Sequence, residues 1–567
     1  MYWLTAVSIS LCLLPRMVQA EAPVWKHGAV AADHPLASQV GVQILRSGGN
    51  VVDAAVATGF AQSVLRPGSS GLGGGGFMVI WDAESRSAKT LDYRERAPAA
   101  ATRDLFTRPG QDGAPASSRR GGKAIGVPGH VAGLCYALRK FGSMPLAEVL
   151  APAIRLAEQG VPLDEHEAAA RSGLVKSFSD QPALQARYPG LWKGYLLQGR
   201  LKRGTKFHSP QLPALRALAR DGQETFYRGE ISRAIVAEIR KQGGILTAAD
   251  LANMDVVERT PLSTPFDDLQ VFSMPPPSSG GVALIECLNI LQALETTTLG
   301  KPIEALEHNS PEYLHVLAEA EKHAFADRAE FLGDADFFDI PVRRLTSPAY
   351  AASLAKRIQL DRTQPLKAYG RFLPVNDAGT THFSVMDARG NAVACTETIN
   401  TGFGSWVVEP RFGIVFNNEM DDFAARPGKP NAFGLIQSEA NAVGPRRKPL
   451  SSMTPTLAVR DGKAVFALGT SGGPRIISAT LQVFLNLSRF RMIPDQAVTR
   501  PRIHHQWLPN RLYLEPGLSD PCKAALQQRG HTVTVRSKLG VCQAVMAAPD
   551  GLRASSDSRK HGQAAGY

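Results

Sequence analysis

The sequence predicts an α+β fold, in which neighbouring strands pair in hairpins and the helices form layers of their own. Residues 382–387 and 392–399 alternate apolar and polar side chains on either side of a short turn, which predicts a β-hairpin. Residues 456–459 and 464–468 repeat this pattern around Asp461-Gly462, a frequent hairpin turn. Helical segments do not alternate one by one with strands, so the chain lacks the regular pattern of a parallel α/β sheet.

Several further segments show helical periodicity. Residues 38–66 combine it with many small side chains, and residues 126–173 contain several short helix candidates. A longer helix is predicted over residues 311–332, where a proline opens the pattern and a glycine follows it. Its apolar stripe consists of Leu314, Leu317, Ala318, Ala324 and Phe331. Another helix is expected over residues 473–485.

The composition is that of an ordinary globular protein with a large core. The chain has 567 residues, of which 44% are hydrophobic and 20% are charged. Its formal net charge of +12 raises the question of nucleic-acid binding. The lysines and arginines are dispersed, without a long basic run or interleaved aromatic residues, so we expect no nucleic-acid partner.

The N-terminal segment has the features of a secretory signal peptide. Residues 3–14 form a short apolar core, and residues 18–20 form a cleavage site of the A-x-A type. The usual early positive charge is missing, because no lysine or arginine precedes Arg16. The core is too short to span a membrane, and no later run is expected to do so. We therefore expect residues 1–20 to be removed and the protein to be periplasmic or secreted.

The cysteines beyond the signal segment are odd in number and widely spaced, which predicts no disulfide framework. Cys522 and Cys542 lie in the same C-terminal stretch and could pair, whereas Cys135, Cys287 and Cys395 are expected to be buried free thiols. The sequence contains neither His-Glu-x-x-His nor Cys-x-x-Cys. We therefore expect no metal ion and no cofactor.

The most informative segment begins at Thr380, which follows Gly379 and opens the alternating strand pattern. Taken alone, a Thr-Thr pair in this place is ordinary β-branched strand sequence. If the Gly379–Thr380 bond is cut, however, Thr380 carries both a hydroxyl nucleophile and a free α-amine. That amine has a reference pKa of about 8 and can act as the base for its own hydroxyl. No histidine or carboxylate is then needed nearby.

Short motifs along nearly the whole mature chain give this threonine a context. They include Asp-Tyr-Arg-Glu-Arg-Ala-Pro at 92–98, Met-Pro-Pro-Pro-Ser-Ser-Gly-Gly at 274–281 and Asn-Asn-Glu-Met-Asp-Asp-Phe at 417–423. The others lie at 71–78, 326–330, 379–387, 391–400, 449–455, 469–475, 502–507 and 565–567. In their order and amino-acid sequence, these motifs resemble those of γ-glutamyltranspeptidase (γ-glutamyltransferase), a family of N-terminal-nucleophile hydrolases.

The resemblance implies a four-layer αββα sandwich made by two interleaved subunits, residues 21–379 and 380–567, from one precursor. It implies that Thr380 first attacks the Gly379 carbonyl, which cuts the chain, and then forms an acyl-enzyme with a γ-glutamyl donor. Thr398 would orient the amine or hydroxyl of Thr380; otherwise it is an ordinary strand threonine. Well-known bacterial members carry glutamine at the position of Gly379. Glycine could ease the strained acyl shift or leave its geometry poorly fixed.

The resemblance also implies which residues bind the α-amino acid end of the donor. These residues are Arg94, Asn400, Glu419, Asp422, Ser451 and Ser452. The arginine and the two serine hydroxyls suit the α-carboxylate, because a guanidinium is planar and permanently charged. The other three side chains offer acceptors to the α-ammonium. Many bacterial relatives carry glutamine where this chain has Glu419, and a glutamate would hold the ammonium more strongly.

Two further roles follow from the resemblance. The backbone amides of Gly472 and Gly473 would stabilise the oxyanion of the tetrahedral intermediate, and glycine permits the close approach. Residues 423–448 resemble a lid that some members have, although a plain surface loop fits the same sequence.

The implied activity is that of an exported γ-glutamyltransferase and glutathione hydrolase. It would split glutathione and similar γ-glutamyl amides, passing the acyl group to water, amino acids or peptides. One alternative is a related cephalosporin (glutaryl) acylase or polyglutamate depolymerase, and another is an unprocessed, non-catalytic scaffold. The ammonium-binding set argues against a glutaryl donor, which has no ammonium.

Two glycine-rich segments suggest other kinds of site. Residues 71–76 fit the Gly-x-Gly-x-x-Gly pattern of dinucleotide-binding folds, but they follow no predicted strand. Residues 469–473 fit the Gly-x-Ser-x-Gly pattern of serine hydrolases. His504, His505 and Asp520 follow, but not in a convincing arrangement for a catalytic triad.

Overall fold

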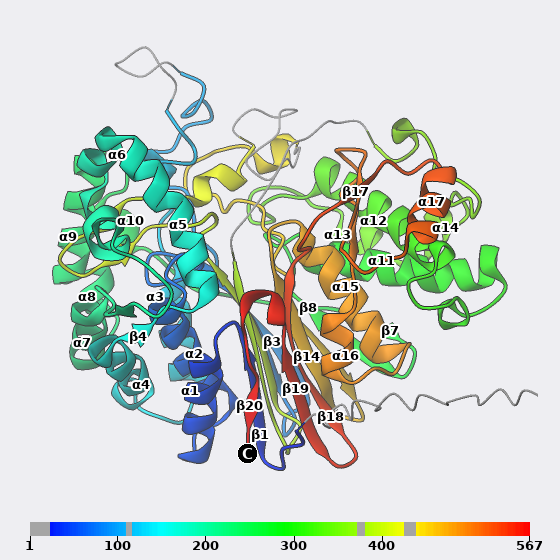
Figure 1. Cartoon of the computed structure of the whole chain (residues 1–567), viewed down its shortest axis with the longest axis horizontal. Coiled ribbons are helices and arrows are strands. Elements are labelled where there is room, and N and C mark those ends of the chain that lie inside the picture. The colour runs from blue at the N-terminus through cyan, green and yellow to red at the C-terminus, as the bar shows by residue number, and fades with distance from the viewer. Residues whose placement is uncertain (1–22, 109–115, 371–379, 425–437) are drawn as a thin grey trace, which may run out of the picture.

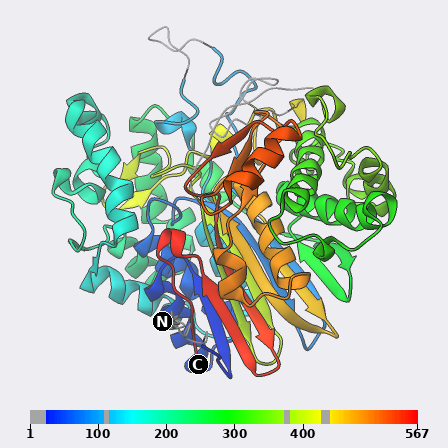
Figure 2. The same cartoon turned by 45° about the vertical axis from the view of Figure 1, so that its right-hand side comes forward.

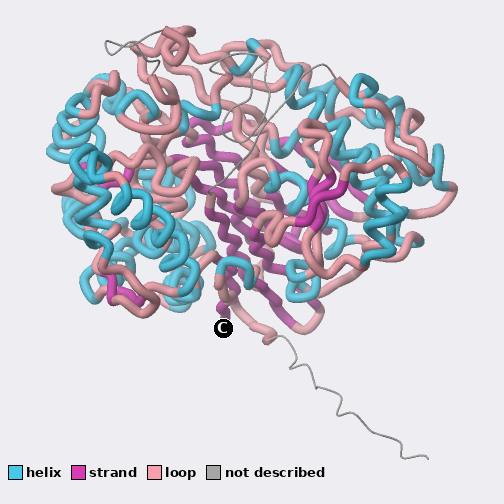
Figure 3. Tube along the Cα trace, turned by 45° about the horizontal axis from the view of Figure 1, so that its top comes forward, coloured by secondary structure: helices cyan, strands magenta, loops and turns pink. Residues whose placement is uncertain are grey.

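The computed structural model describes residues 23–108, 116–370, 380–424 and 438–567, which form a four-layer αββα sandwich. Two β-sheets pack face to face, and helices cover the outer face of each (Figure 1). Figure 3 shows the same order from another side, with the strands enclosed between two groups of helices. The α+β class and the sandwich that the resemblance implied are confirmed.

The first sheet has seven strands in the order β20-β1-β9-β10-β2-β3-β6, and all neighbours are antiparallel. Its centre is the hairpin of β9 and β10, which the alternation after Thr380 predicted. The strands are β1 Gly28–Ala32, β2 Gly75–Asp82, β3 Ser87–Tyr93, β6 Val257–Arg259, β9 Thr381–Asp387, β10 Ala392–Thr398 and β20 Ala565–Gly566.

The second sheet has six strands in the order β19-β18-β14-β13-β8-β7, again all antiparallel. It contains the second predicted hairpin, formed by β13 and β14. The strands are β7 Leu262–Phe266, β8 Leu269–Ser273, β13 Thr456–Arg460, β14 Lys463–Ser471, β18 Val541–Ala548 and β19 Gly551–Ser556. Many alanines lie between the two sheets, among them Ala29, Ala31, Ala394 and Ala467, because facing sheets leave little room for side chains.

The helices against the first sheet come from the N-terminal half of the chain. They are α1 Pro35–Arg46, α2 Val51–Leu65, α3 His130–Phe141, α4 Leu146–Gln159, α5 Glu165–Asp180, α6 Pro182–Arg187, α7 Leu212–Asp221, α8 Glu224–Tyr227, α9 Glu230–Lys241 and α10 Ala248–Ala252. The predicted periodic segment 38–66 is thus two helices. Asn50 ends the turn between them and caps α2 through a reciprocal pair of hydrogen bonds with Asp53.

The helices of the other outer layer come from two separate parts of the chain. They are α11 Gly280–Leu294, α12 Pro311–Phe331, α13 Val342–Leu345, α14 Pro348–Ala355, α15 Arg475–Ser488, α16 Pro494–Thr499 and α17 Asp520–Gln528. The predicted helices over 311–332 and 473–485 correspond to α12 and α15. Small strands complete the structure: β4 Val161–Pro162, β5 Lys206–Phe207, β11 Val408–Glu409, β12 Ile414–Val415, β15 Ile503–His504, β16 Leu512–Leu514 and β17 Val533–Val535.

One helix contradicts the expectation that no run beyond the signal segment could span a membrane. In the described part of the chain, the helical run Gly280–Leu299, which begins with α11, is long and apolar enough by length and composition, with a mean hydropathy of 1.2. Yet 61% of its most apolar window is buried inside the protein, where α11 packs against α12, α14 and α15. This burial is typical of a core helix, whose apolar sequence serves packing.

Segments from the two sides of Thr380 contribute strands to both sheets, and in the first sheet they alternate. In the first sheet, β9 and β10 lie between β1 and β2, and β20 pairs with β1 at the edge. Figure 2 shows blue β1 and red β18 and β19, from opposite ends of the chain, side by side in the centre of the molecule. Cutting the chain before Thr380 would therefore leave two segments that still share their sheets.

The cysteines of the described residues are free. Cys135, Cys287, Cys395, Cys522 and Cys542 are all buried thiols. The pairing of Cys522 with Cys542 that the sequence allowed is not formed. The Cys522 thiol instead faces the backbone carbonyl of Asn309, and Cys542 lies within β18.

Candidate active site

Thr380 lies directly before β9 and is 6% exposed. Its hydroxyl donates a hydrogen bond to the hydroxyl oxygen of Thr398, over 3.4 Å, at the end of the neighbouring strand β10. The backbone amide of Asn400 donates to the same Thr398 oxygen, over 2.8 Å. The β9–β10 hairpin therefore brings the predicted nucleophile and its predicted orienting residue together. Gly379, the other side of the predicted cleavage bond, lies outside the described residues.

A buried ion pair holds the backbone of Thr380. The Lys560 ammonium donates to the Thr380 carbonyl oxygen over 2.9 Å and to the Asp33 carboxylate over 2.5 Å. The Thr381 hydroxyl also donates to Asp33, over 2.8 Å. Asp33 follows β1, and Lys560 lies in the C-terminal tail, so both chain ends fix the nucleophile. Neither residue was predicted from the sequence, since nothing local marks a contact between positions so far apart.

A small pocket lies beside Thr380. Its lining includes Thr398 and every residue predicted to bind the donor, namely Arg94, Asn400, Glu419, Asp422, Ser451 and Ser452. Gly473 also lines the pocket, but Gly472 does not. Both glycines lie in the turn from β14 to α15 and have positive φ angles, 139° at Gly472 and 60° at Gly473.

Arg94 forms ion pairs with two acidic residues of the same pocket. Its guanidinium binds the carboxylates of Glu419 and Asp422, and the Asp422 contact measures 2.6 Å. Burial alone would lower the pKa of Arg94, but the two carboxylates outweigh it and raise that pKa above its ordinary value. Burial raises the pKa of both Glu419 and Asp422, and Arg94 opposes the rise. The predicted carboxylate-binding and ammonium-binding groups thus bind one another.

Two acceptors at the pocket are unused within the described part of the chain. The Asn400 side-chain oxygen and one carboxylate oxygen of Glu419, Oε2, are buried without a hydrogen-bond partner there. Asn400 is held by a hydrogen bond from its amide nitrogen to the Asn418 carbonyl, over 3.0 Å, and has a φ of 72°. Buried acceptors of this kind are costly unless a donor satisfies them. They suit a ligand cation with several N–H groups.

The segment at 275–281 fixes the two serines of the pocket. The Ser278 hydroxyl donates to the Met453 carbonyl and the Ser279 hydroxyl donates to the Ser451 carbonyl, each over 2.6 Å. Arg328, on α12, also lines the pocket and donates to the Ser452 hydroxyl over 3.3 Å. These residues lie in segments that carry the family resemblance, but no role for them was predicted from the sequence.

The predicted lid falls mostly beyond what the structure describes. Residues 425–437, the middle of the segment 423–448, lie outside the described residues. The segment is anchored after this gap, where the Asn441 side chain donates to the Asp422 carbonyl over 2.7 Å and accepts from the Leu450 amide over 2.9 Å.

The glycine-rich segment at 71–76 has a packing role. It leads into β2 instead of following a strand, which does not fit a dinucleotide-binding turn. A side chain at Gly73 or Gly74 would approach the carbonyl oxygens of Val415 and Thr398 to 2.2 and 2.1 Å. The glycines therefore allow close contact between backbones.

The serine-hydrolase pattern at 469–473 does lie in a strand–turn–helix context, between β14 and α15. Of the histidines that follow it in the sequence, His504 is engaged elsewhere, because it hydrogen-bonds to Ser478 and Gln506. The described contacts therefore do not connect Ser471 to a histidine base.

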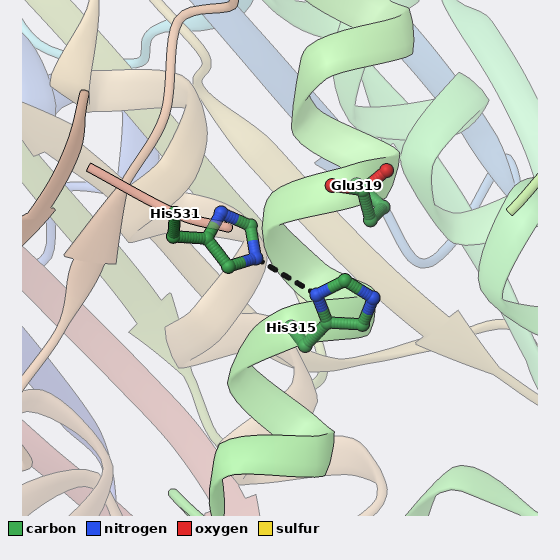
Figure 4. A group of neighbouring side chains, drawn as sticks. All are labelled: His315, Glu319 and His531. Atoms are coloured by element: carbon green, nitrogen blue, oxygen red, sulfur yellow. Dashed lines mark hydrogen bonds between the residues drawn. The ribbon is translucent and has the colours of Figure 1, made fainter. Parts of the chain in front are cut away.

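A cluster of potential metal ligands lies apart from this pocket. Figure 4 shows His531 facing His315, with Glu319 one turn further along α12. His315 and His531 share a 2.8 Å hydrogen bond, and the other ring nitrogen of His315 lies 2.7 Å from the Gln359 carbonyl. Glu319 accepts from Lys322 over 2.7 Å. A cation would have to break the histidine pair and displace this ammonium, so the cluster fits a hydrogen-bond network. His315 and Glu319 are four residues apart on a predicted helix, so the sequence alone could have placed these two side chains next to each other.

The similarities of this chain to known proteins agree with its sequence motifs and with the geometry of the site. A family model described as gamma-glutamyltranspeptidase matches residues 37–567. A relative from Escherichia coli (strain K12), named glutathione hydrolase proenzyme, is 42% identical over 543 residues, which cover 94% of this chain and 90% of the relative. A solved cephalosporin acylase from Bacillus halodurans aligns with a TM-score of 0.83 and 27% identity, over 99% of both chains. A solved γ-glutamyltranspeptidase from Helicobacter pylori aligns with a TM-score of 0.55 and 34% identity, over 63% of this chain and 97% of its own.

Proposed function

The chain belongs to the γ-glutamyltranspeptidase family, and on this premise we propose that it is an exported γ-glutamyltransferase that matures by cutting itself before Thr380. Membership makes it an enzyme of the γ-glutamyltransferase and glutathione hydrolase type, built as an N-terminal-nucleophile hydrolase. The proposal adds the self-cleavage, the Thr380 acyl-enzyme, the acyl transfer to amines and the export.

The observation that carries the proposal is the polarity of the pocket beside Thr380. Unused acceptors on Asn400 and Glu419 and the cationic group of Arg328 line the same small space. An α-amino acid end group carries an ammonium and a carboxylate on one carbon, which is the complementary arrangement. A γ-glutamyl amide bound by that end group would extend its amide carbonyl towards Thr380.

Maturation begins with an attack by the Thr380 hydroxyl on the Gly379 carbonyl carbon. The bond from that carbon to the Thr380 nitrogen breaks, the nitrogen takes up the proton, and an ester links Gly379 to the Thr380 side chain. Water then hydrolyses the ester, leaving a carboxylate on Gly379 and a free α-amine on Thr380. Lys560 holds the Thr380 carbonyl, which remains part of the new N-terminal residue throughout.

The mature enzyme uses the same hydroxyl on its substrate. The Thr380 α-amine takes the hydroxyl proton as the oxygen attacks the γ-amide carbonyl. Backbone amides at Gly472 and Gly473 would stabilise the oxyanion, a contribution whose loss typically slows such reactions by about 100-fold or more. The proton passes to the leaving amine, and a γ-glutamyl ester remains on Thr380. Attack by water releases glutamate, and attack by an amino-acid or peptide amine gives a new γ-glutamyl amide.

Glutathione hydrolysis by the purified, processed protein tests the proposed activity. We expect release of glutamate and cysteinylglycine, and a γ-glutamyl product when an acceptor dipeptide is added. Liquid chromatography with mass detection measures both. A processed protein that leaves glutathione intact would rule the proposal out.

A glutaryl acylase is the second candidate, because the solved cephalosporin acylase aligns over 99% of both chains. A glutaryl group has the distal carboxylate but no ammonium, so it would leave the acceptors of Asn400 and Glu419 unused. Comparing glutaryl with γ-glutamyl p-nitroanilide separates the candidates. We expect the γ-glutamyl compound to react faster; faster glutaryl hydrolysis with no action on glutathione would establish the acylase instead.

Export is the part of the proposal that rests on the sequence alone. Residues 1–20 have the composition of a signal peptide, and they lie outside the described residues. Fractionation of the producing cells tests it: we expect activity outside the cytoplasm, with a large subunit that begins at Glu21.

Replacing Lys560 by methionine is expected to lower kcat about 10-fold and to slow chain cleavage, with KM changed less than about twofold. The variant removes the donor to the Thr380 carbonyl and leaves Asp33 without its cation, so the nucleophile loses its fixed position while the donor pocket stays intact. Steady-state kinetics and a time course of cleavage measure the effect. Lys560→Arg should recover part of the rate. A raised KM with an unchanged kcat would contradict this role.

A further inference from the structure

The cluster of ionisable side chains on α12 binds a segment that leads towards the cleavage bond. Residues 357–370, the anchored segment, follow α14 and precede Thr380 in the chain. Their regular secondary structure is one helical turn, Leu366–Ala368. A stretch of this kind cannot fix its own backbone by internal hydrogen bonds, so its position depends on contacts with its surroundings.

One buried carboxylate on α12 receives two hydroxyls of the anchored segment. Glu319 accepts from the Thr363 hydroxyl over 2.8 Å and from the Tyr369 hydroxyl. The Lys322 ammonium donates to the same carboxylate over 2.7 Å and also to the Thr363 oxygen. Glu319 and Lys322 are 0% and 1% exposed, so water does not compete for these bonds. The pair therefore holds the segment at two points, the second of them at its end.

The same face of α12 contacts the anchored segment one turn before and one turn after this carboxylate. His315 lies one turn before Glu319 (Figure 4), and one of its ring nitrogens is 2.7 Å from the Gln359 carbonyl oxygen. His323 lies one turn after Glu319, and its ring packs against that of Tyr369 with the centroids 4.9 Å apart. Three side chains in a row along the helix thus bind one neighbouring segment.

The C-terminal part of the chain covers the anchored segment from another side. The Thr363 amide donates to the Arg529 carbonyl over 2.7 Å, and the Trp507 indole donates to the Leu366 carbonyl over 3.2 Å. A side chain on Gly370 would approach the Trp507 ring to 2.9 Å, so the backbone there lies directly against the indole. The segment is thus held between α12 and residues that follow the cleavage bond.

The anchored segment sets the length of chain between a fixed point and the cleavage bond. Thr380 is about 10 residues from Gly370 but about 25 residues from Ala355, the end of α14. The connecting residues 371–379 lie outside the described residues. The chance that a chain places its end at one spot falls as about the −3/2 power of its length. Losing the anchor would therefore lower that chance about fourfold.

We infer that the Glu319–Lys322 pair, through the anchored segment, positions the cleavage bond for attack by Thr380 during maturation. In that step the new ester bond forms to the Thr380 oxygen, the peptide bond to its nitrogen breaks, and the nitrogen takes up the proton. Neither member of the pair lines the donor pocket. After cleavage the anchored segment belongs to a free chain end, so turnover of γ-glutamyl donors no longer depends on it. This inference rests on the proposed function.

Removing the two hydroxyls of the anchored segment tests the inference and leaves the ion pair on α12 in place. Thr363→Val and Tyr369→Phe each delete one bond to Glu319, and the double variant deletes both. Cell-free synthesis supplies uncut precursor, and a denaturing gel follows the appearance of the fragment that begins at Thr380. We expect the double variant to cut itself about fourfold more slowly, with intermediate rates for the single variants.

The mature enzyme provides the readout that a general structural defect would change. Once cut, the double variant should hydrolyse γ-glutamyl p-nitroanilide with kcat and KM within about 1.5-fold of the wild-type values, counted per cut chain. A loss confined to cleavage is the expected signature of a group that positions only the precursor.

Tyr350→Phe is the matched control. Tyr350 lies on α14, outside the anchored segment, and donates to the buried carboxylate of Asp327 on α12 over 2.7 Å. The substitution therefore deletes the same kind of bond to the same helix. We expect it to leave the rate of cleavage unchanged.

An insertion tests the inference without any change in the core, and it decides the question if the double variant does not fold. About 15 glycine and serine residues placed after Gly370 give an anchored chain the length of an unanchored one. We expect them to slow cleavage about fourfold in the otherwise wild-type protein, and only about twofold further in the double variant.

Cleavage of the double variant at the wild-type rate would overturn the inference, as would an insertion without effect. Equal slowing by Tyr350→Phe, or a loss of kcat in the cut enzyme that matches the loss of cleavage, would show a general structural effect and overturn it as well. Failure of the proposed function looks different. In that case the wild-type chain itself stays uncut, or is cut and leaves the γ-glutamyl donor intact.

Discussion

Thr380→Ala is expected to remain a single uncut chain and to lose γ-glutamyl hydrolysis by a factor of about 10⁴ or more. The substitution removes the one hydroxyl that serves both the cleavage of the Gly379–Thr380 bond and the attack on the donor. No other group can replace it, because the base for the reaction is the α-amine that the cleavage itself creates. A denaturing gel with N-terminal sequencing shows the cleavage, and p-nitroaniline release shows the activity.

Thr380→Ser is the matched variant, since it keeps a hydroxyl at the same place. We expect it to cut itself more slowly and to yield the fragments 21–379 and 380–567. Cleavage of the alanine variant at the same bond would contradict the mechanism. A wild-type protein that also stays in one piece would favour the non-catalytic scaffold that the sequence left open. Gly379, in place of the glutamine of well-known bacterial members, would then be the first residue to test as the cause of the missing cleavage.

Arg94→Met is expected to lower the free energy of unfolding by about 3–5 kcal/mol. It leaves the carboxyls of Glu419 and Asp422 buried without their cation, and methionine fills a similar space without a charge. The same change should raise KM for γ-glutamyl donors, because the acids that receive the ammonium lose their fixed position. Urea unfolding measures the first effect. Both proteins should carry Thr380→Ala, so that each unfolds as one chain.

The loss of stability in Arg94→Met should depend on pH. Burial already raises the pKa of both carboxyls, and the substitution removes Arg94, whose charge is the largest effect opposing that rise. The folded variant therefore favours their protonated forms, whereas in the unfolded chain they titrate near pH 4. Protonation removes the penalty at low pH, and stability falls as the pH rises above about 4. We expect a larger deficit at pH 8 than at pH 5.

A second substitution checks the cause. Adding Glu419→Gln to Arg94→Met removes one of the two uncompensated acids, and it should restore part of the stability at pH 8. A deficit that does not vary with pH, or no rescue by glutamine, would show that packing and not charge explains the effect.

Local patterns predicted those parts of the fold that local physics determines. The hairpins β9–β10 and β13–β14 were visible as alternation around a turn, and α12 was visible from its proline start and glycine end. The resemblance added the four-layer arrangement and the pocket residues, all but Gly472 of which line one space with Thr380. The Cys522–Cys542 bridge that the sequence left open is not formed, because closeness along the chain says little about the distance between two thiols.

The apolar run at α11 shows where composition misleads. Length and hydropathy alone cannot distinguish a helix packed inside a protein from one that crosses a membrane, and only the surrounding α12, α14 and α15 decide the matter. A similar ambiguity held for the glycines at 71–76. Their need for close backbone contact became visible only once Val415 and Thr398 lay beside them.

By itself, the sequence determined the α+β class, the hairpin that begins after Thr380 and ends at Thr398, and, through its motifs, the family. Only the tertiary structure decided that Lys560 and Asp33 hold the Thr380 backbone and that Arg94 is bound by Glu419 and Asp422. The physical reason is that secondary structure follows from neighbours along the chain. Burial and ion pairing depend on residues that the fold brings together from hundreds of positions apart.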